Sequence, residues 1–199
     1  MARAITVLER YNTRLTPRIL EIPEGTIFAE VTEALGFAAG NSELVADAFF
    51  DFFRRRVIAY PETFAVLQHL RAAGVEVGVL TDVPYGMDRA RVEADLAAAG
   101  LDGLLTVLLT SVDVGRRKPS SRGFVRLAAE LGVPIADLIY VGNERKDIDG
   151  ANTADARSVL IDRDDRRPTW GAWATITSLE EVVALLESLG HASGIGPSR

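Results

Sequence analysis

The hydrophobic positions of this 199-residue chain change their spacing near residue 60. Before that point they recur at helical intervals, as Ala4, Val7 and Tyr11 do. This spacing predicts three helices, over residues 3–14, 26–36 and 42–58. Residues 18–24 remain ambiguous between a short strand and a loop, because Pro23 is poorly suited to a central strand. The first 60 residues are therefore expected to form a helical lobe.

After residue 60, short apolar runs alternate with segments of helical periodicity. The runs predict four strands, over residues 75–80, 104–110, 138–141 and 158–161. The segments around them predict five helices, over residues 62–73, 87–99, 121–131, 147–154 and 179–189. Such alternation indicates a parallel sheet with helices on both faces, and strands that are apolar throughout are typical of burial on both sides.

The predicted fold is therefore α/β, with a doubly wound, Rossmann-like parallel sheet. Its expected organisation is a helical cap lobe over residues 1–60, a core over residues 61–190, and a disordered tail over residues 191–199, which is rich in Gly, Ser and Pro.

The amino-acid composition excludes several kinds of site and argues against some classes of binding partner. Hydrophobic residues make up 48% of the chain and charged residues 25%, as in ordinary globular proteins. The chain has no cysteine, which excludes disulfides, thiol catalysis and Cys/His zinc sites. A net charge of −6 argues against nucleic-acid or membrane-surface binding. No signal-peptide pattern and no long apolar run is visible, so a cytoplasmic protein is expected.

Polar residues follow three of the predicted strands. Thr81 and Asp82 follow the first, Lys118 lies in the loop after the second, and Asn143 and Asp147 follow the third. The carboxyl ends of parallel strands share one edge, so Thr81, the Lys118 loop and the pair Asn143 and Asp147 are expected to lie close together. A hydroxyl, an ammonium and carboxylate oxygens near Mg²⁺ would suit a phosphate or carboxylate ligand. Taken singly, each residue has a structural alternative: helix capping for Thr81 and Asp147, and solvent exposure for Lys118.

Three short motifs carry a resemblance. Residues 78–82 read Gly-Val-Leu-Thr-Asp, residues 114–119 read Val-Gly-Arg-Arg-Lys-Pro, and residues 141–151 run from Val-Gly-Asn to an Asp and then to Gly-Ala. In this order they resemble motifs two to four of the haloacid dehalogenase-like (HAD) hydrolase superfamily, which consists mostly of phosphatases. The resemblance covers about residues 60–189, and residues 1–60 resemble the latter part of the family's helical cap.

The resemblance implies roles for the strand-end residues. Lys118 and Thr81 would be catalytic, and Thr81, Asp82 and Lys118 would bind the substrate. Asn143 and Asp147 would hold Mg²⁺. The commonest form of the fourth motif has Asp in place of Asn143, so weak metal binding at best is expected.

The family's first motif, Asp-x-Asp-x-Thr, does not occur in the sequence, and its first Asp is the family's nucleophile. The nearest echo is Glu-Ile-Pro-Glu-Gly-Thr at residues 21–26. We expect that the chain begins inside the cap, because the start codon was assigned too late or the gene lost its first strand.

The family's first strand lies between the strands at residues 75–80 and 138–141. We therefore expect one of three arrangements: these two strands pair directly, residues 18–23 fill the gap, or a second chain fills it.

The resemblance thus implies a Mg²⁺-dependent phosphatase of a small phosphorylated metabolite, inactive if the nucleophile is lacking. One alternative is a non-catalytic binding or regulatory module that retains an anion pocket, and a third is a haloacid dehalogenase. The expected partner is a small phosphorylated molecule, not nucleic acid or a membrane. Unpaired strand edges would also favour a homodimer.

Overall fold

The computed structural model describes residues 1–54 and 57–192, and its strands form two separate parallel sheets. In the first, β1 (Gly78–Thr81) pairs with β2 (Val107–Thr110). In the second, the order is β3 (Ile139–Gly142), β4 (Arg157–Ile161) and β5 (Ala174–Ile176). The predicted α/β class with parallel strands is confirmed, since every pairing between these strands is parallel.

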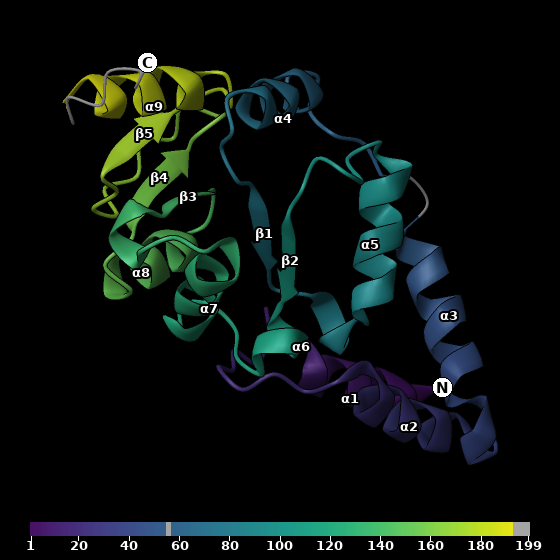
Figure 1. Cartoon of the computed structure of the whole chain (residues 1–199). Coiled ribbons are helices and arrows are strands. Elements are labelled where there is room, and N and C mark those ends of the chain that lie inside the picture. Colours follow the sequence, from purple (N-terminus) through teal and green to yellow (C-terminus); the bar gives the residue numbers. More distant parts are fainter. Residues whose placement is uncertain (55–56, 193–199) are drawn as a thin grey trace.

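The N-terminal helices are α1 (Ala2–Tyr11), α2 (Glu24–Leu35) and α3 (Ser42–Phe53), with a 3₁₀ turn η1 (Ala39–Asn41) before α3. Gly36 ends α2 at φ +80°, a conformation that glycine adopts without strain. Phe28 and Phe50 join α2 to α3 with ring centroids 5.4 Å apart. Figure 1 shows α1 and α2 lying across the end of the first sheet to which β1 and β2 point. The division into a cap lobe and a core stays a prediction.

The remaining helices flank the strands (Figure 1). They are α4 (Thr63–Ala72), α5 (Arg89–Ala98), α6 (Ser111–Val114), α7 (Arg122–Leu131), α8 (Arg145–Thr153) and α9 (Glu181–Ala192), with 3₁₀ turns η2 (Pro84–Gly86) and η3 (Ile135–Asp137). The helix α4 lies beside α9 at the start of β1, and α7 lies at the opposite side of the strands. None of the helices in the described residues is long and apolar enough to cross a membrane.

The two sheets are separated by a gap between β1 and β3 (Figure 1). The expectation that these strands pair directly is wrong, because each joins a different sheet. The expectation that residues 18–23 fill the gap is also wrong. Leu20 instead bridges Arg116 in antiparallel fashion, and the Arg117 N–H donates to the Ile19 carbonyl at 2.8 Å. The third expectation, a second chain in the gap, stays a prediction.

Several boundaries differ from the expectations. The helix α3 ends at Phe53, before residue 58. A short helix, α6, occupies part of the expected loop because Thr110 and Asp113 form a capping box. The three residues of β5 were not expected as a strand. Residues 191 and 192 belong to α9, and the rest of the expected tail lies outside the described residues.

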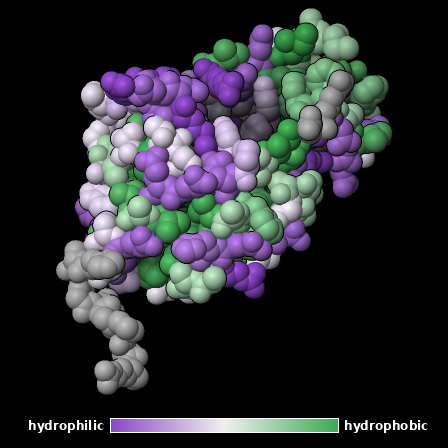
Figure 2. All heavy atoms as spheres, turned by 90° about the horizontal axis from the view of Figure 1, so that it is seen from above, coloured by the Kyte–Doolittle hydropathy of each residue, from purple (hydrophilic) through white to green (hydrophobic). Residues whose placement is uncertain are grey.

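Large hydrophobic side chains remain exposed outside the core. Between the end of α3 and the start of α4, Phe53, Ile58 and Tyr60 are among the exposed ones. On the face seen in Figure 2, hydrophobic side chains show between hydrophilic ones. Buried hydrophobic residues form three clusters, one of which joins β1 and β2 to α7, β3 and α8. Packing therefore crosses the gap on one side, although backbone pairing does not.

Candidate active-site pocket

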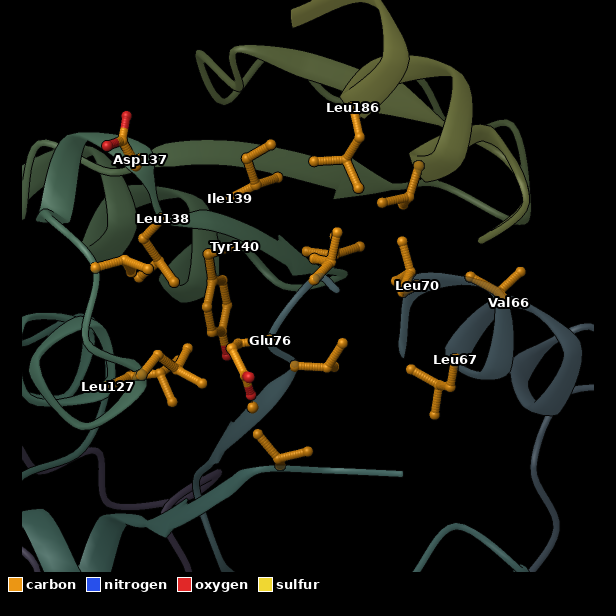
Figure 3. Close-up of a pocket in the computed structure, with 18 of the residues that line it drawn as sticks. Val66, Leu67, Leu70, Glu76, Leu127, Asp137, Leu138, Ile139, Tyr140 and Leu186 are labelled. Atoms are coloured by element: carbon orange, nitrogen blue, oxygen red, sulfur yellow. The ribbon is translucent and has the colours of Figure 1, made fainter. Parts of the chain in front are cut away.

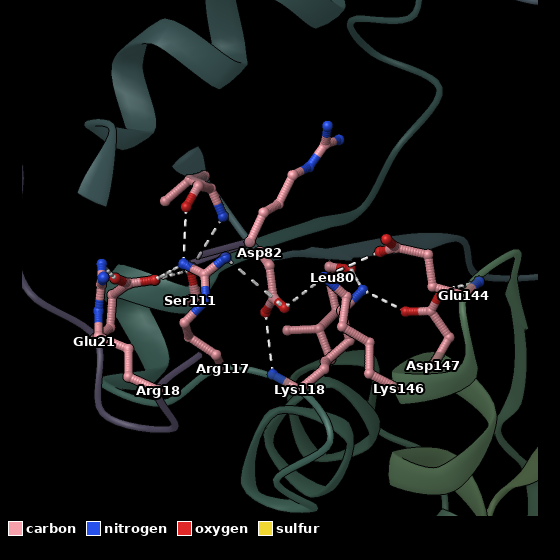
Figure 4. Close-up of polar contacts among 12 residues, drawn as sticks. Arg18, Glu21, Leu80, Asp82, Ser111, Arg117, Lys118, Glu144, Lys146 and Asp147 are labelled. Carbon is pink, nitrogen blue, oxygen red and sulfur yellow. Dashed lines mark hydrogen bonds and ion pairs between the residues drawn. The ribbon is translucent and has the colours of Figure 1, made fainter. Parts of the chain in front are cut away.

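The centre of the candidate site is Lys118, which follows α6 and reaches across the gap between the sheets. Its Nζ lies 2.6 Å from Asp147 Oδ1, 2.9 Å from the Tyr140 hydroxyl and 3.4 Å from the Leu80 carbonyl (Figure 4). Only 10% of the Lys118 side chain and 4% of the Asp147 side chain are exposed. The ion pair is therefore shielded from water and strengthened by low local polarity.

The protonation of Lys118 follows from these contacts. Burial alone would lower the pKa of Lys118, but its interactions with Tyr140 and Asp147 outweigh burial and raise that pKa. Burial is also the main reason why the pKa of Tyr140 is raised, so its hydroxyl keeps its proton. This hydroxyl donates to the Leu80 carbonyl at 2.8 Å. Lys118 is thus a fixed positive charge at the carboxyl end of β1.

Asp147 is held in place by the start of α8. Its Oδ2 accepts hydrogen bonds from the Asn143 N–H at 3.1 Å and the Glu144 N–H at 2.9 Å. Glu144 completes a reciprocal capping box with Asp147. Gly142 is required here, since a Cβ on it would lie 2.4 Å from the Cβ of Asp147. The carboxylate therefore both caps the helix and holds Lys118.

Asp82 binds the other side of the Lys118 loop. Its Oδ1 accepts a hydrogen bond from the Lys118 N–H at 3.0 Å, and its Oδ2 lies 3.1 Å from Lys146 Nζ. Lys146 also contacts Glu144 Oε2 at 2.9 Å. With 4% of its side chain exposed against 32% for Lys146, Asp82 is the buried member of this pair. Of the residues expected to converge, Lys118 and Asp147 are in direct contact, and Asp82 lies beside them. The catalytic and binding roles of these residues stay predictions.

Glu21 was not expected among the functional residues, although the acidic echo at residues 21–26 had pointed to this segment. Its side chain is 1% exposed, and it ion-pairs with Arg117 and with Arg18 at 3.2 Å. Ser111 Oγ donates to Glu21 Oε2 at 2.5 Å, and Arg117 Nη1 donates to the Val83 carbonyl at 2.8 Å. Glu21 therefore clamps the N-terminal segment to the loops that follow β1 and β2 (Figure 4).

Several of the side chains described above border a cavity of about 640 Å³. Its lining is Thr13, Arg14, Pro17, Arg18, Ile19, Asp82, Pro84, Arg117, Lys118, Pro119, Glu144 and Lys146. Asp82 and Lys118 line it, whereas Thr81, Asn143 and Asp147 are not among the described lining residues. Thr81 ends β1 opposite Thr110 of β2, and the Asn143 side chain is exposed.

The cavity wall is predominantly cationic. Five cationic side chains line it, and two carboxylates. Glu21 and Asp147 stand behind this wall and neutralise part of the charge. Cations still outnumber carboxylates, so the pocket favours an anion such as a phosphate group.

A Mg²⁺ ion in this pocket would need several oxygen ligands from the surrounding side chains. Asp82 Oδ2 and Asp147 Oδ1 are buried, and each is already engaged by a lysine ammonium, at 3.1 Å and 2.6 Å. The described residues hold no group of three acidic or histidine side chains placed to bind a metal. Because Mg²⁺ demands near-octahedral oxygen ligands, these residues do not fit a complete magnesium site on their own. The assignment of Mg²⁺ to Asn143 and Asp147 stays a prediction.

Comparison with known proteins agrees with this geometry. A sequence model of the haloacid dehalogenase-like hydrolase family matches residues 8–155. A phosphoserine phosphatase of Thermus thermophilus is 35% identical over 138 residues, which are 69% of this chain and 53% of that protein. A phosphatase of Mycobacterium tuberculosis is 27% identical over 164 residues, which are 80% of this chain and 72% of that protein.

Among solved structures, a 2-haloacid dehalogenase from Pseudomonas syringae aligns with a TM-score of 0.69 and 20% identity, over 95% of this chain and 81% of that one. At this identity the likeness shows the shared fold. The chain spans about half the length of several curated phosphatases that it matches.

Proposed function

Because the chain belongs to the haloacid dehalogenase-like hydrolases, we propose that its cationic pocket binds the phosphate group of a small phosphorylated metabolite and that the protein hydrolyses this ester. The observation that carries the proposal is the set of cations at the carboxyl ends of the strands, centred on Lys118. Relatives named as phosphatases support the same reaction class. The buried Lys118 is a fixed charge that a phosphate oxygen meets without reorganisation.

The residues differ in how they contact the ligand. Arg14 is exposed, and Lys146 is partly exposed and pairs with Asp82 and Glu144, so a phosphate oxygen would meet the Arg14 side chain directly and would compete with these carboxylates for Lys146. Asp82 positions Lys118 and Lys146 indirectly, because it accepts a hydrogen bond from the Lys118 N–H and pairs with the Lys146 ammonium. A charge-assisted hydrogen bond contributes about 1.5–3 kcal/mol, which is roughly a tenfold to hundredfold effect on affinity.

The experiment combines binding with turnover. Calorimetry measures the affinity for inorganic phosphate, and p-nitrophenyl phosphate hydrolysis is measured with and without Mg²⁺. We expect Lys146→Ala to weaken phosphate binding about tenfold or more. The matched control is Arg126→Ala, because Arg126 pairs with Glu130 on α7 and does not line the pocket.

The outcomes separate the candidate functions. Binding and turnover that are both reduced by Lys146→Ala support the phosphatase. Phosphate binding without turnover would replace it with the non-catalytic anion-binding module, which the absence of an Asp-x-Asp motif in the sequence favours. Release of halide from a 2-haloacid, without phosphate binding, would favour a dehalogenase. Equal phosphate affinity in Lys146→Ala and the parent would refute the proposed pocket.

A further inference from the structure

The N-terminal segment forms one wall of the cationic cavity. The Arg117 N–H donates to the Ile19 carbonyl at 2.8 Å, and the Glu21 N–H donates to the Gly115 carbonyl at 3.1 Å. These backbone hydrogen bonds fix the segment to the loop that follows β2. The residues of this wall that line the cavity are Thr13, Arg14, Pro17, Arg18 and Ile19.

The cations of the cavity fall into two groups. Figure 4 shows Arg18 and Lys146 on opposite sides of Asp82. The arginine side consists of Arg14, Arg18 and Arg117, and the lysine side consists of Lys118 and Lys146. A ligand that fills the cavity would therefore meet cations at two separate places.

The arginine side has a surplus of positive charge. One carboxylate, that of Glu21, pairs with both Arg18 and Arg117. The Asp82 carboxylate lies 4.0 Å from Arg117 Nη2 but 3.1 Å from Lys146 Nζ, so it belongs to the lysine side. Three cations and one carboxylate therefore leave the arginine side with a net charge of +2.

The lysine side has no such surplus. Its two cations pair with three carboxylates, which leaves a net charge of −1; the partners are Asp147 for Lys118, and Asp82 and Glu144 for Lys146. An anion at the lysine side competes with these carboxylates. An anion at the arginine side meets cations that are short of partners.

Two donors on the arginine side lack an acceptor. The exposed Arg14 guanidinium forms no ion pair or hydrogen bond with any residue that the structure describes. Arg18 is 15% exposed, and its Nη atoms donate to the Tyr11 carbonyl at 2.8 Å and to Glu21 at 3.2 Å. Its Nε is buried and has no acceptor among the described residues. A buried donor without an acceptor is costly, so an anionic ligand would be stabilised here.

The other cavity of the molecule offers no such place. It has a volume of about 500 Å³ and lies between β1 and β3, where Leu70, Leu127 and Leu186 are among its apolar lining residues (Figure 3). Its charged lining residues are the carboxylates Glu76 and Asp137, which repel an anion.

We propose that the arginine side is a second anion subsite, so that the substrate carries another anionic group, a carboxylate or a second phosphate, besides its phosphate ester. This inference rests on the proposed function, in which Lys118 meets the ester phosphate. The planar guanidinium fork donates to two oxygens of one anion, which fits both kinds of group. Inorganic phosphate meets one side at a time, whereas a ligand with two anionic groups meets both.

The test is calorimetry of the full chain with phosphonates, which keep a phosphate-like group but are not hydrolysed. In 3-methylbutylphosphonate two methyl groups replace the carboxylate oxygens of 3-phosphonopropionate, so the two ligands differ in charge and little in shape. We expect the carboxylate ligand to bind about tenfold more tightly, which is the effect of one charge-assisted hydrogen bond. Ethane-1,2-bisphosphonate carries a second phosphate-like group instead. Whichever of these two ligands gains more over 3-methylbutylphosphonate identifies the second anionic group as a carboxylate or a phosphate.

Three variants locate the two groups of the ligand. Arg14→Gln should reduce the tenfold preference for the carboxylate ligand to about twofold or less, because it removes the unpaired cation. Lys146→Ala should weaken the binding of both ligands by the same factor and leave the preference unchanged. The control is Arg3→Gln, which removes one exposed charge from α1 outside the cavity and should change neither affinity.

The outcomes separate this inference from the proposed function. If 3-methylbutylphosphonate binds and Lys146→Ala weakens it, but neither second anionic group adds affinity, the phosphate site stands and the second subsite is refuted. A preference that Arg14→Gln leaves intact would also refute the subsite. So would a preference that is lost in Lys146→Ala, because the second group would then lie on the lysine side. No binding of any phosphonate would overturn both proposals.

Discussion

The ion pair between Lys118 and Asp147 should contribute strongly to stability, and Lys118→Met tests this. The substitution leaves the Asp147 carboxylate, of which 4% is exposed, without its 2.6 Å partner. Removing one member of a buried pair costs about 3–5 kcal/mol, because the remaining charge stays desolvated. For a protein of this size, about 2–4 °C of melting temperature is lost per kcal/mol, so we expect a decrease of roughly 6–20 °C.

The partner substitution completes a double-mutant cycle. Asp147→Asn removes the charge but keeps an oxygen that accepts the Asn143 and Glu144 N–H groups. Urea unfolding of both single variants and the double variant should give a coupling energy of up to about 3 kcal/mol. In the double variant neither buried charge is left alone, so its loss should be clearly smaller than the sum of the single losses.

The control for this cycle is Lys146→Met. Lys146 lies 3.1 Å from Asp82 and 32% of its side chain is exposed. Without Lys146, Asp82 would keep Arg117 Nη2 at 4.0 Å and the hydrogen bond from the Lys118 N–H, so its charge would not be left alone. A pair of this kind contributes about 1 kcal/mol or less. If Lys118→Met costs no more than Lys146→Met, or if the cycle is additive, burial does not have the energetic role that we assign to it.

Three further predictions concern the residues around the site. Gly150→Ala places a Cβ 2.5 Å from Phe124 Cε2 and should cost about 1–3 kcal/mol in urea unfolding, whereas Gly25→Ala, with open space around it, should not destabilise. Glu21→Gln removes the charge that pairs with the buried Arg117 guanidinium, so the free energy of unfolding should fall by about 3 kcal/mol or more. A decrease below about 1 kcal/mol would contradict the role of Glu21 in holding the N-terminal segment. Because the pKa of Tyr140 is raised, the free energy of unfolding should fall as pH rises above about 10, and less steeply in Tyr140→Phe; equal slopes would argue against its burial as the cause.

Topology made much of the site predictable from sequence. Asp82, Lys118 and Asp147 are far apart in the chain, yet each follows a strand of a parallel fold, and the shared edge brings them together. The helices were predictable from a local pattern, since apolar residues recur about every 3.6 positions along them. Gly36 could be recognised as a helix end because glycine adopts the left-handed conformation without strain, and its φ is indeed +80°.

Other features depend on contacts that no local pattern shows. Glu21 lies beside Pro23 in an irregular segment, and its burial comes from Arg117 and Ser111, which are about 90 residues away. The gap between the sheets was expected to close, to be filled from residues 18–23 or to be filled by a second chain, and the first two are wrong because strand pairing depends on partners elsewhere in the chain. The short helix α6 did have a signal, the Thr110 and Asp113 spacing of a capping box, within a run that looked like a polar loop.

Because the strands form two separate sheets, the ion pairs of the pocket connect two halves of the molecule. Lys118 is attached to the half with β1 and β2, and Asp147 to the half with β3. The contact between Asp82 and Lys146 spans the same boundary. A phosphate that draws Lys146 away from Asp82 would weaken this contact between the two halves. Ligand binding and the rigidity of the molecule are thus coupled through Lys146.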